Sequence, residues 1–290
     1  MILVTGATGH FGKATIDFLL EKGVSAGTIA AFVRDESKAT ALKEKGIILR
    51  KGDYDDYASL VTAFRGVDKL LLVSGSDIAN RAKQQENAVN AAREAGVKHI
   101  VYTSFVRKNE TETSPIAFVG KSHIATDKLI KASGIPYTLM LNGLYADVLP
   151  MFFGDKVLET GIFLPAGEGK AAYTTRQDMA EAAAVILTSA DHKNKEYVIT
   201  APVNYSLHEA AALLTEVTGK KVSYSKPSAT IYTETLTKAG VPGEYIGMFA
   251  GFSEAISQGE FETTGGDLEK LLGRKPASLK KYFESVYPSN

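Results

Sequence analysis

Short apolar runs alternate with amphipathic segments along the first 142 residues of the chain. Several runs are apolar throughout, which is typical of strands covered on both faces, and the segments between them carry apolar residues at helical spacing. The pattern predicts strands at 2–5, 28–33, 47–51, 69–73, 99–103 and 137–141, and helices near 13–22, 36–45, 56–64, 80–95 and 121–133. This repeated βα order predicts an α/β fold with a Rossmann-type, doubly wound parallel sheet.

The pattern changes after residue 142, where proline and glycine interrupt a loop-rich stretch. It then predicts one more helix and strand at 176–190 and 196–200, followed by helices at 206–218, 229–239, 243–258 and 276–287 around a short strand at 221–224. We therefore expect residues 1–142 to form the Rossmann domain, with 176–200 returning to it. Residues 143–175 and 201–290 are expected to form a smaller, mainly helical cap over the carboxyl edge of the sheet.

Three glycines connect the first strand to the first helix, in the stretch VTGATGHFG at 4–12. A strand that turns into a helix through glycines presents bare N–H groups at the helix N-terminus, which suits a phosphate. We expect this turn to bind the pyrophosphate of a dinucleotide through Gly6, Thr8, Gly9, His10, Phe11 and Gly12. The alternative is a tight turn without a ligand, which the surrounding βαβ unit disfavours.

The second strand ends at Arg34 and Asp35, where the adenosine ribose is expected. A guanidinium there suits a 2′-phosphate, so the sequence favours NADP over NAD. Asp35 either binds a ribose hydroxyl or caps the next helix. After the third strand, Asp53 and Tyr54 are candidates for the adenine, the alternative being that Asp53 or Asp55 caps the helix near residue 57. Ser74 and Gly75 follow the fourth strand, and their small side chains allow the chain to pass close to the cofactor.

Composition narrows the functional classes. The 33 basic and 33 acidic residues cancel, so no overall field attracts nucleic acid or an anionic membrane. The chain has no cysteine, and its five histidines are scattered, which disfavours thiol chemistry and a metal site. No apolar run approaches the length of a membrane span, and the first strand begins at residue 2. We expect a metal-free cytoplasmic protein, either a monomer or a homodimer.

The motifs also carry a family resemblance that runs nearly end to end. They are VTGATGHFG at 4–12, VRDESKA at 33–39, GDYDD at 52–56, AAREAGVKHIVYTS at 91–104, HIATDKLIKASGIPYTLMLNGLY at 123–145 and TTRQDMAEAAA at 174–184. The sequence resembles the NmrA-like atypical short-chain dehydrogenases, and within them the bacterial NADPH quinone oxidoreductases and triphenylmethane reductases. The resemblance implies bound NADP and direct hydride delivery to a flat, conjugated small-molecule acceptor.

One departure from the wider superfamily concerns its Tyr-x-x-x-Lys pair. If Asp127 is the acidic residue that follows this pair, His123 takes the lysine position and Val119 the tyrosine position. No tyrosine then serves as general acid, which counts against alcohol dehydrogenation and sugar-nucleotide epimerisation. The rival to a reductase is a non-enzymatic NADP sensor that acts through a protein partner.

The candidate catalytic residues are His123, Ser104, Asn142 and Tyr145, and Leu141, Asn142 and Gly143 are expected at the nicotinamide edge. Each has a structural alternative. His123 can be a helix histidine bonded to backbone, Ser104 an ordinary strand-end residue, and Asn142 part of an Asn-Gly turn. Tyr145, with Phe152 and Phe153 nearby, either lines an aromatic wall or belongs to the core. The charged stretch that begins at Arg107 is expected to be a solvated loop.

Overall fold

A seven-stranded parallel sheet forms the centre of the computed structural model, which describes residues 1–263 and 265–288. The strand order is β11-β6-β5-β4-β1-β2-β3, and each neighbouring pair is parallel. The strands are β1 (Ile2–Val4), β2 (Ile29–Val33), β3 (Ile48–Lys51), β4 (Lys69–Leu72), β5 (His99–Phe105), β6 (Tyr137–Asn142) and β11 (Lys195–Ile199). The predicted α/β fold and doubly wound sheet are confirmed.

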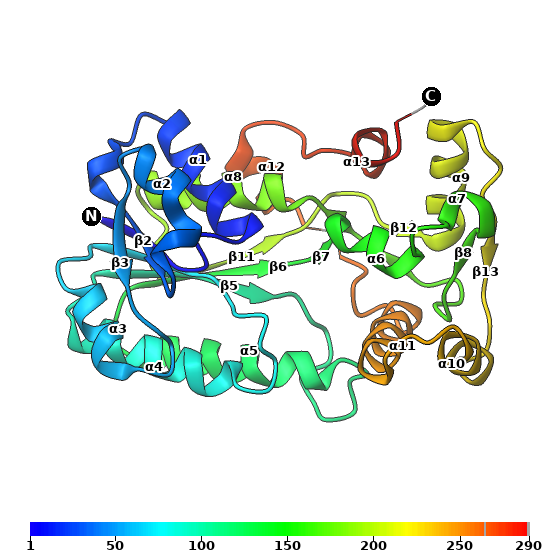
Figure 1. The fold of residues 1–290 in the computed structure, drawn as a ribbon, viewed down its shortest axis with the longest axis horizontal. Helices are drawn as coiled ribbons and strands as arrows, with labels where there is room; N and C mark the ends of the chain where they lie inside the picture. Colours follow the sequence, from blue (N-terminus) through cyan, green and yellow to red (C-terminus); the bar gives the residue numbers. More distant parts are fainter. Residues whose placement is uncertain (264, 289–290) are drawn as a thin grey trace.

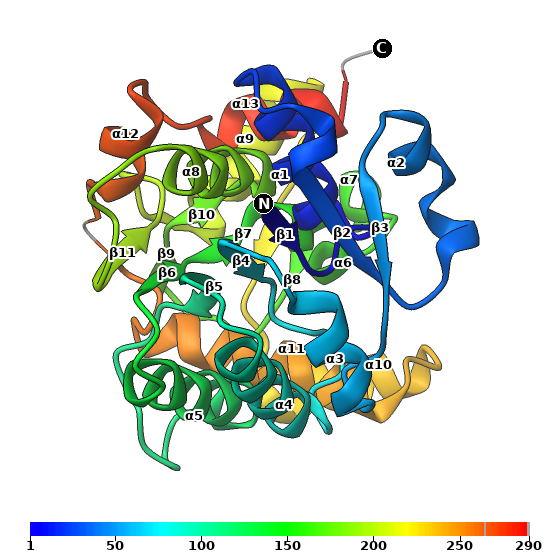
Figure 2. The same cartoon turned by 90° about the vertical axis from the view of Figure 1, so that its left-hand side faces the viewer.

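Helices cover both faces of this sheet (Figures 1 and 2). One face carries α3 (Tyr57–Phe64), α4 (Arg81–Glu94) and α5 (Ala117–Ala132), and the other carries α1 (His10–Glu21), α8 (Arg176–Thr188) and α12 (Asp267–Leu272). The short α2 (Thr40–Glu44) follows β2. Each face has its own apolar core, and the strands β2 and β4 bury every apolar residue, as their unbroken hydrophobic runs predict.

The remaining elements lie beyond the carboxyl ends of the strands (Figure 1). They comprise α6 (Leu149–Phe153), α7 (Val157–Thr160), α9 (Leu207–Thr218), α10 (Ala229–Lys238), α11 (Gly243–Ser257) and α13 (Leu279–Val286), with the short strands β7 (Leu144–Tyr145), β8 (Ile162–Phe163), β9 (Lys170–Ala171), β10 (Tyr173–Thr174), β12 (Tyr205–Ser206) and β13 (Tyr224–Ser225). A third apolar core unites most of them. None of the helices in the described ranges is long and apolar enough to cross a membrane.

Several elements differ from the sequence prediction, among them the first helix, α12 and the short elements between residues 144 and 174. The first helix begins at His10 instead of residue 13, so it starts inside the glycine motif. The helix α12 was not predicted; its Leu268 is buried in the core that α1 and α8 share with the sheet. The division into a Rossmann domain and a cap remains a prediction.

Candidate functional site: a glycine cleft beside an apolar cavity

The turn between β1 and α1 requires glycine at two positions. Gly6 adopts a φ of +58°, which side chains other than glycine rarely adopt. A Cβ on Gly12 would lie 2.4 Å from the carbonyl oxygen of Gly6, so only glycine allows the helix to start this close to the strand. Gly9 is the exposed N-cap of α1. The first turn of α1 therefore presents its free N–H groups to an anion.

This turn forms one wall of a cleft of about 570 Å³, which we call the glycine cleft. It is lined by most of the residues that the sequence predicts for the cofactor: Gly6, Thr8, Gly9, His10, Phe11, Gly12, Arg34, Asp53, Tyr54, Ser74 and Gly75. Val73 and Ser76, which flank the predicted Ser74 and Gly75, line the cleft as well. The lining residues that the sequence did not assign to the site are Phe32, Val33, Asp77, Gln84 and Arg176. Most of these further residues lie at or just after strand ends, next to residues that were predicted. Their position in the sequence could therefore have identified them as part of the cleft.

The two residues that follow β2 have different roles: Arg34 is an exposed cation, and Asp35 caps the next helix. Arg34 is exposed in the glycine cleft and has no ion-pair partner within the described ranges. The Asp35 carboxylate accepts a hydrogen bond from the Ser37 N–H at 3.0 Å, so its capping alternative is the one observed. A second bond, from the Ser37 hydroxyl, lowers the pKa of Asp35 most, and the bond from the Ser37 N–H lowers it further. The arrangement leaves the guanidinium available to an anionic ligand.

The end of β3 also presents polar groups to the glycine cleft. Asp56 caps α3 by accepting from the Ser59 N–H at 3.2 Å, so the alternative in which Asp53 or Asp55 caps this helix is wrong. Asp53 instead accepts from the Asp55 N–H and lines the cleft. Tyr54 lines it too, and its buried hydroxyl has no partner in the described structure. Burial raises the pKa of Tyr54 to about 12.

A second, apolar cavity of about 270 Å³ adjoins the glycine cleft. The two share Ser74, Ser76 and Tyr145, so the cleft and the cavity meet at these three residues. The cavity is lined further by groups from β5 and α5 on the sheet side and by side chains from α6 and α11 on the other: Ser104, Phe105, Val119, His123, Met151, Phe152, Met248 and Phe252. Phe153 does not line the cavity. Its ring packs against Phe283, with the two ring centroids 6.5 Å apart.

His123 is a buried side chain on the wall of the apolar cavity. Its Nδ1 lies 2.9 Å from the Tyr102 hydroxyl, and its ring stacks on Phe105 with centroids 5.7 Å apart. Burial, with Arg81 and Arg107 adding to it, holds the pKa of His123 well below its usual value. The imidazole is therefore neutral at pH 7 and acts as a hydrogen-bonding group instead of a cation.

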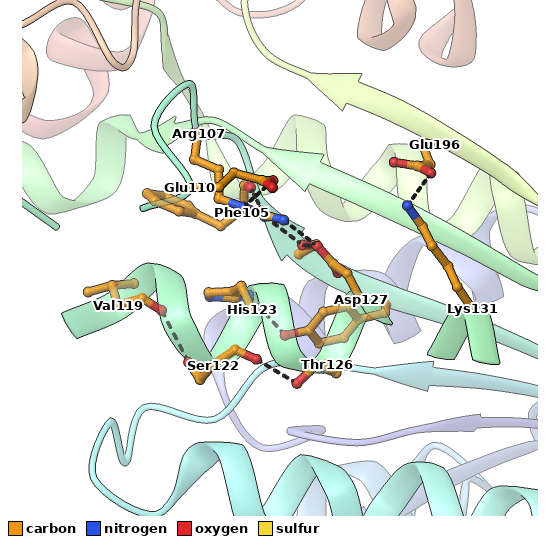
Figure 3. A network of polar contacts seen from close by, with 12 residues as sticks. Phe105, Arg107, Glu110, Val119, Ser122, His123, Thr126, Asp127, Lys131 and Glu196 are labelled. Atoms are coloured by element: carbon orange, nitrogen blue, oxygen red, sulfur yellow. Dashed lines mark hydrogen bonds and ion pairs between the residues drawn. The ribbon is translucent and has the colours of Figure 1, made fainter. Parts of the chain in front are cut away.

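Ser104 belongs to a buried polar cluster at the end of β5 with Arg107 and Asp127, both of which are labelled in Figure 3. Its hydroxyl donates to the Asp127 carboxylate at 2.9 Å, and Arg107 donates to the same oxygen at 2.8 Å. Burial raises the pKa of Asp127, and the bonds from Arg107 and Ser104 oppose this rise. The side chain of Arg107 is only 9% exposed, so the expectation of a solvated loop was wrong for this residue.

Of the three residues predicted at the end of β6, only Gly143 lines the glycine cleft or the apolar cavity. Asn142 is fully buried, and neither its amide nitrogen nor its amide oxygen has a partner in the described part of the chain. Leu141 packs against the apolar cores and lines neither space. Gly143 lines the apolar cavity, and a Cβ there would lie 2.6 Å from the Thr200 methyl. The assignment of Leu141 and Asn142 to the cofactor remains a prediction.

No group of three or more histidine, aspartate or glutamate side chains within the described ranges is arranged to hold a metal ion. The glycine cleft instead has the chemistry of a nucleotide site. It combines exposed backbone N–H groups at a helix N-terminus with an unpaired guanidinium and an unpartnered phenol.

Comparison with known proteins agrees with this geometry. The sequence profile of the NmrA-like family matches residues 1–286. The chain belongs to the NmrA-like family. Quinone oxidoreductase 2 of Escherichia coli (strain K12) is 38% identical over 291 residues, covering 100% of both chains.

Two solved structures extend the comparison within the NmrA-like family. The Citrobacter sp. triphenylmethane reductase complexed with NADP(H) superimposes with a TM-score of 0.91 at 39% identity, over 99% of this chain and 100% of the other. The NADPH-dependent quinone oxidoreductase of E. coli complexed with NADPH gives 0.90 at 37% identity, with the same coverage. The chain is thus a homologue, over its whole length, of an NADPH-dependent quinone oxidoreductase, as the resemblance predicts.

Proposed function

We propose that this chain is an NADPH-dependent reductase that transfers hydride directly to a quinone or a similar conjugated acceptor. The observation that carries the proposal is the junction of the two spaces: a polar glycine cleft and an apolar cavity share Ser74, Ser76 and Tyr145 in their walls. A nucleotide and a flat aromatic molecule can meet at such a junction. Two relatives, a reductase and a quinone oxidoreductase that form complexes with NADP(H) and NADPH, support the same function.

The glycine cleft would hold the cofactor through groups of different chemistry. The N–H groups after Gly9 would bind the pyrophosphate, Arg34 would bind the 2′-phosphate, and Asp53 and Tyr54 would contact the adenine; all of these residues line the cleft, as the assignment requires. Tyr145 stands at the junction, where the Arg176 guanidinium lies 5.0 Å from the centre of its ring. When bound, NADPH supplies the hydride.

The apolar cavity would position the acceptor and exclude water. Phe105, Phe152 and Phe252 offer flat surfaces for a conjugated ring. Val119 and His123 stand one turn apart on α5, so we propose that no tyrosine–lysine pair protonates the product. Neutral His123 instead hydrogen-bonds the acceptor oxygen, while the Ser104 hydroxyl stays bonded to Asp127, and the proton comes from solvent after hydride transfer. An electron-poor quinone tolerates this order because it accepts hydride without prior protonation.

The direct test follows the absorbance of NADPH in the presence of benzoquinones, a naphthoquinone and a triphenylmethane dye, with NADH in parallel. We expect turnover with a preference for NADPH. Tight NADPH binding without oxidation by any acceptor would contradict the reductase and favour the sensor. An absence of NADPH binding would overturn both.

A further inference from the structure

Arg81, the first residue of α4, places a buried positive charge on the wall of the apolar cavity. The residue is only 5% exposed. Its guanidinium donates to the Ser122 hydroxyl at 2.8 Å, to the Val119 carbonyl at 3.0 Å and to the Gly75 carbonyl at 3.4 Å. These three acceptors are all neutral. No carboxylate lies within ion-pair distance of Arg81 in the described ranges.

An unpaired buried cation is unusual, because removing a charge from water is costly unless a counter-charge or a ligand compensates for it. Arg107, the other buried arginine near the cavity, shows the usual solution, since it is paired with Asp127. His123 is neutral and contributes no charge. The walls of the cavity therefore carry one net positive charge. Arginine remains protonated under such conditions.

We propose that Arg81 sets the charge preference of the apolar cavity, stabilising the negative charge that hydride addition creates on a neutral quinone and disfavouring cationic acceptors. This inference rests on the proposed reductase function. A guanidinium fixed by three hydrogen bonds is preorganised, and in a cavity with few polar groups its effect on a developing charge is larger than in water.

The chemistry differs between the two kinds of acceptor. A neutral quinone that gains a hydride becomes a hydroquinone monoanion, which then takes one proton from solvent. A cationic triphenylmethane dye that gains a hydride at its central carbon becomes a neutral leuco compound and needs no proton. In both reactions the two electrons come from the dihydronicotinamide, which is oxidised. Only the quinone develops a negative charge beside Arg81.

The test compares Arg81→Gln and Arg81→Lys with the wild type and with Arg93→Gln, which removes an exposed arginine from the same helix. For each protein, kcat/KM is measured with NADPH and either a neutral naphthoquinone or a cationic triphenylmethane dye. We expect Arg81→Gln to lower the quinone-to-dye ratio of kcat/KM by at least about tenfold. Arg81→Lys should restore part of the ratio, and Arg93→Gln should leave it unchanged.

A binding measurement supplies a second readout that does not depend on turnover. Calorimetric titration with an ionised hydroxynaphthoquinone should show weaker binding to Arg81→Gln than to the wild type, whereas binding of the cationic dye should be unchanged or tighter. The thermal unfolding midpoint identifies a variant that fails to fold, in which case Arg81→Lys carries the comparison. Equal losses for both acceptors, or an unchanged ratio in folded variants, would overturn the inference. A wild type that oxidises NADPH with neither acceptor would instead overturn the proposed function.

Discussion

Arg34 is the residue on which we propose that the preference for NADPH over NADH depends. It is exposed, lines the glycine cleft and has no ion-pair partner in the described part of the chain. A charge-assisted hydrogen bond to phosphate is worth about 1.5–3 kcal/mol, or roughly 10- to 100-fold in affinity. We expect Arg34→Ala to weaken NADPH by that factor and to leave NADH nearly unchanged, as measured by fluorescence titration. Lys38→Ala, which removes an exposed cation from the same segment, is the control. Equal losses for both cofactors would contradict the assignment.

Individual residues differ in how far the sequence could predict their roles. The glycine motif is local, because a strand, a turn and a helix follow one another within a dozen residues, and its place in the cleft is as expected. Arg81 and Arg107 were not foreseen, because their environments come from segments distant along the chain. The partners of Arg81 include Val119 and Ser122 on α5, and Arg107 meets Asp127.

The strand β5 contains a histidine, His99, that makes the free energy of unfolding depend on pH. It opens β5, is 3% exposed and lies 2.8 Å from the Thr138 hydroxyl on β6. Burial, reinforced by Lys69, Lys193 and His192, lowers its pKa from 6.5 to about 4. Between these values the unfolded chain binds more protons than the folded one, so the stabilisation present above pH 6.5 declines as the pH falls towards 4.

We therefore expect His99→Asn to reduce the pH dependence of stability. Between pH 7.5 and pH 5 the wild type should lose on the order of 2 kcal/mol of unfolding free energy more than the variant. Urea denaturation at both pH values gives this difference. His123 and His192, whose pKa values are also lowered, titrate in both proteins and cancel in the comparison. Parallel losses in the two proteins would show that His99 titrates normally.

Elements were predictable where burial dictates their pattern. The sheet strands are apolar runs, and the long helices repeat apolar residues at helical spacing, so their positions follow from the sequence. The helix α12 escaped detection because it has only six residues, of which Leu268 alone is buried. The two-residue strands β7 to β10 were missed for a related reason: they are too short to show any periodicity, and their partners, such as Leu144 and Tyr173, are distant along the chain.

The apolar cavity forms only when distant segments of the chain come together in the folded protein. Its sheet side comes from β5 and α5, whereas Met248 and Phe252 come from α11, more than a hundred residues later in the chain. Such a surface has no local signature, because each aromatic residue in it also suits an ordinary core. Phe252 illustrates the point. Its ring contacts Phe118, Phe152 and Phe261, with centroids 6.2, 5.8 and 5.9 Å away. The sequence alone therefore identifies the cofactor far better than the acceptor.

If the glycine cleft binds NADPH and the apolar cavity binds the acceptor, a substitution on α11 should change the KM for the acceptor alone. Phe252 lines the apolar cavity but not the glycine cleft. An aromatic pair contributes about 0.5–1.5 kcal/mol beyond the area it buries. We expect Phe252→Leu to raise the KM for a naphthoquinone by roughly 2- to 13-fold and to leave the KM for NADPH unchanged.

Steady-state kinetics with each substrate varied in turn measures both KM values. The matched control is Phe163→Leu, because Phe163 is a half-buried phenylalanine that packs on Tyr232 and lines neither space. This control should leave both KM values unchanged, whereas a general loosening of the fold would alter them in both variants. If Phe252→Leu instead raised the two KM values equally, the cavity and the cleft would act as one binding site, and the acceptor would have to be sought along the cofactor itself.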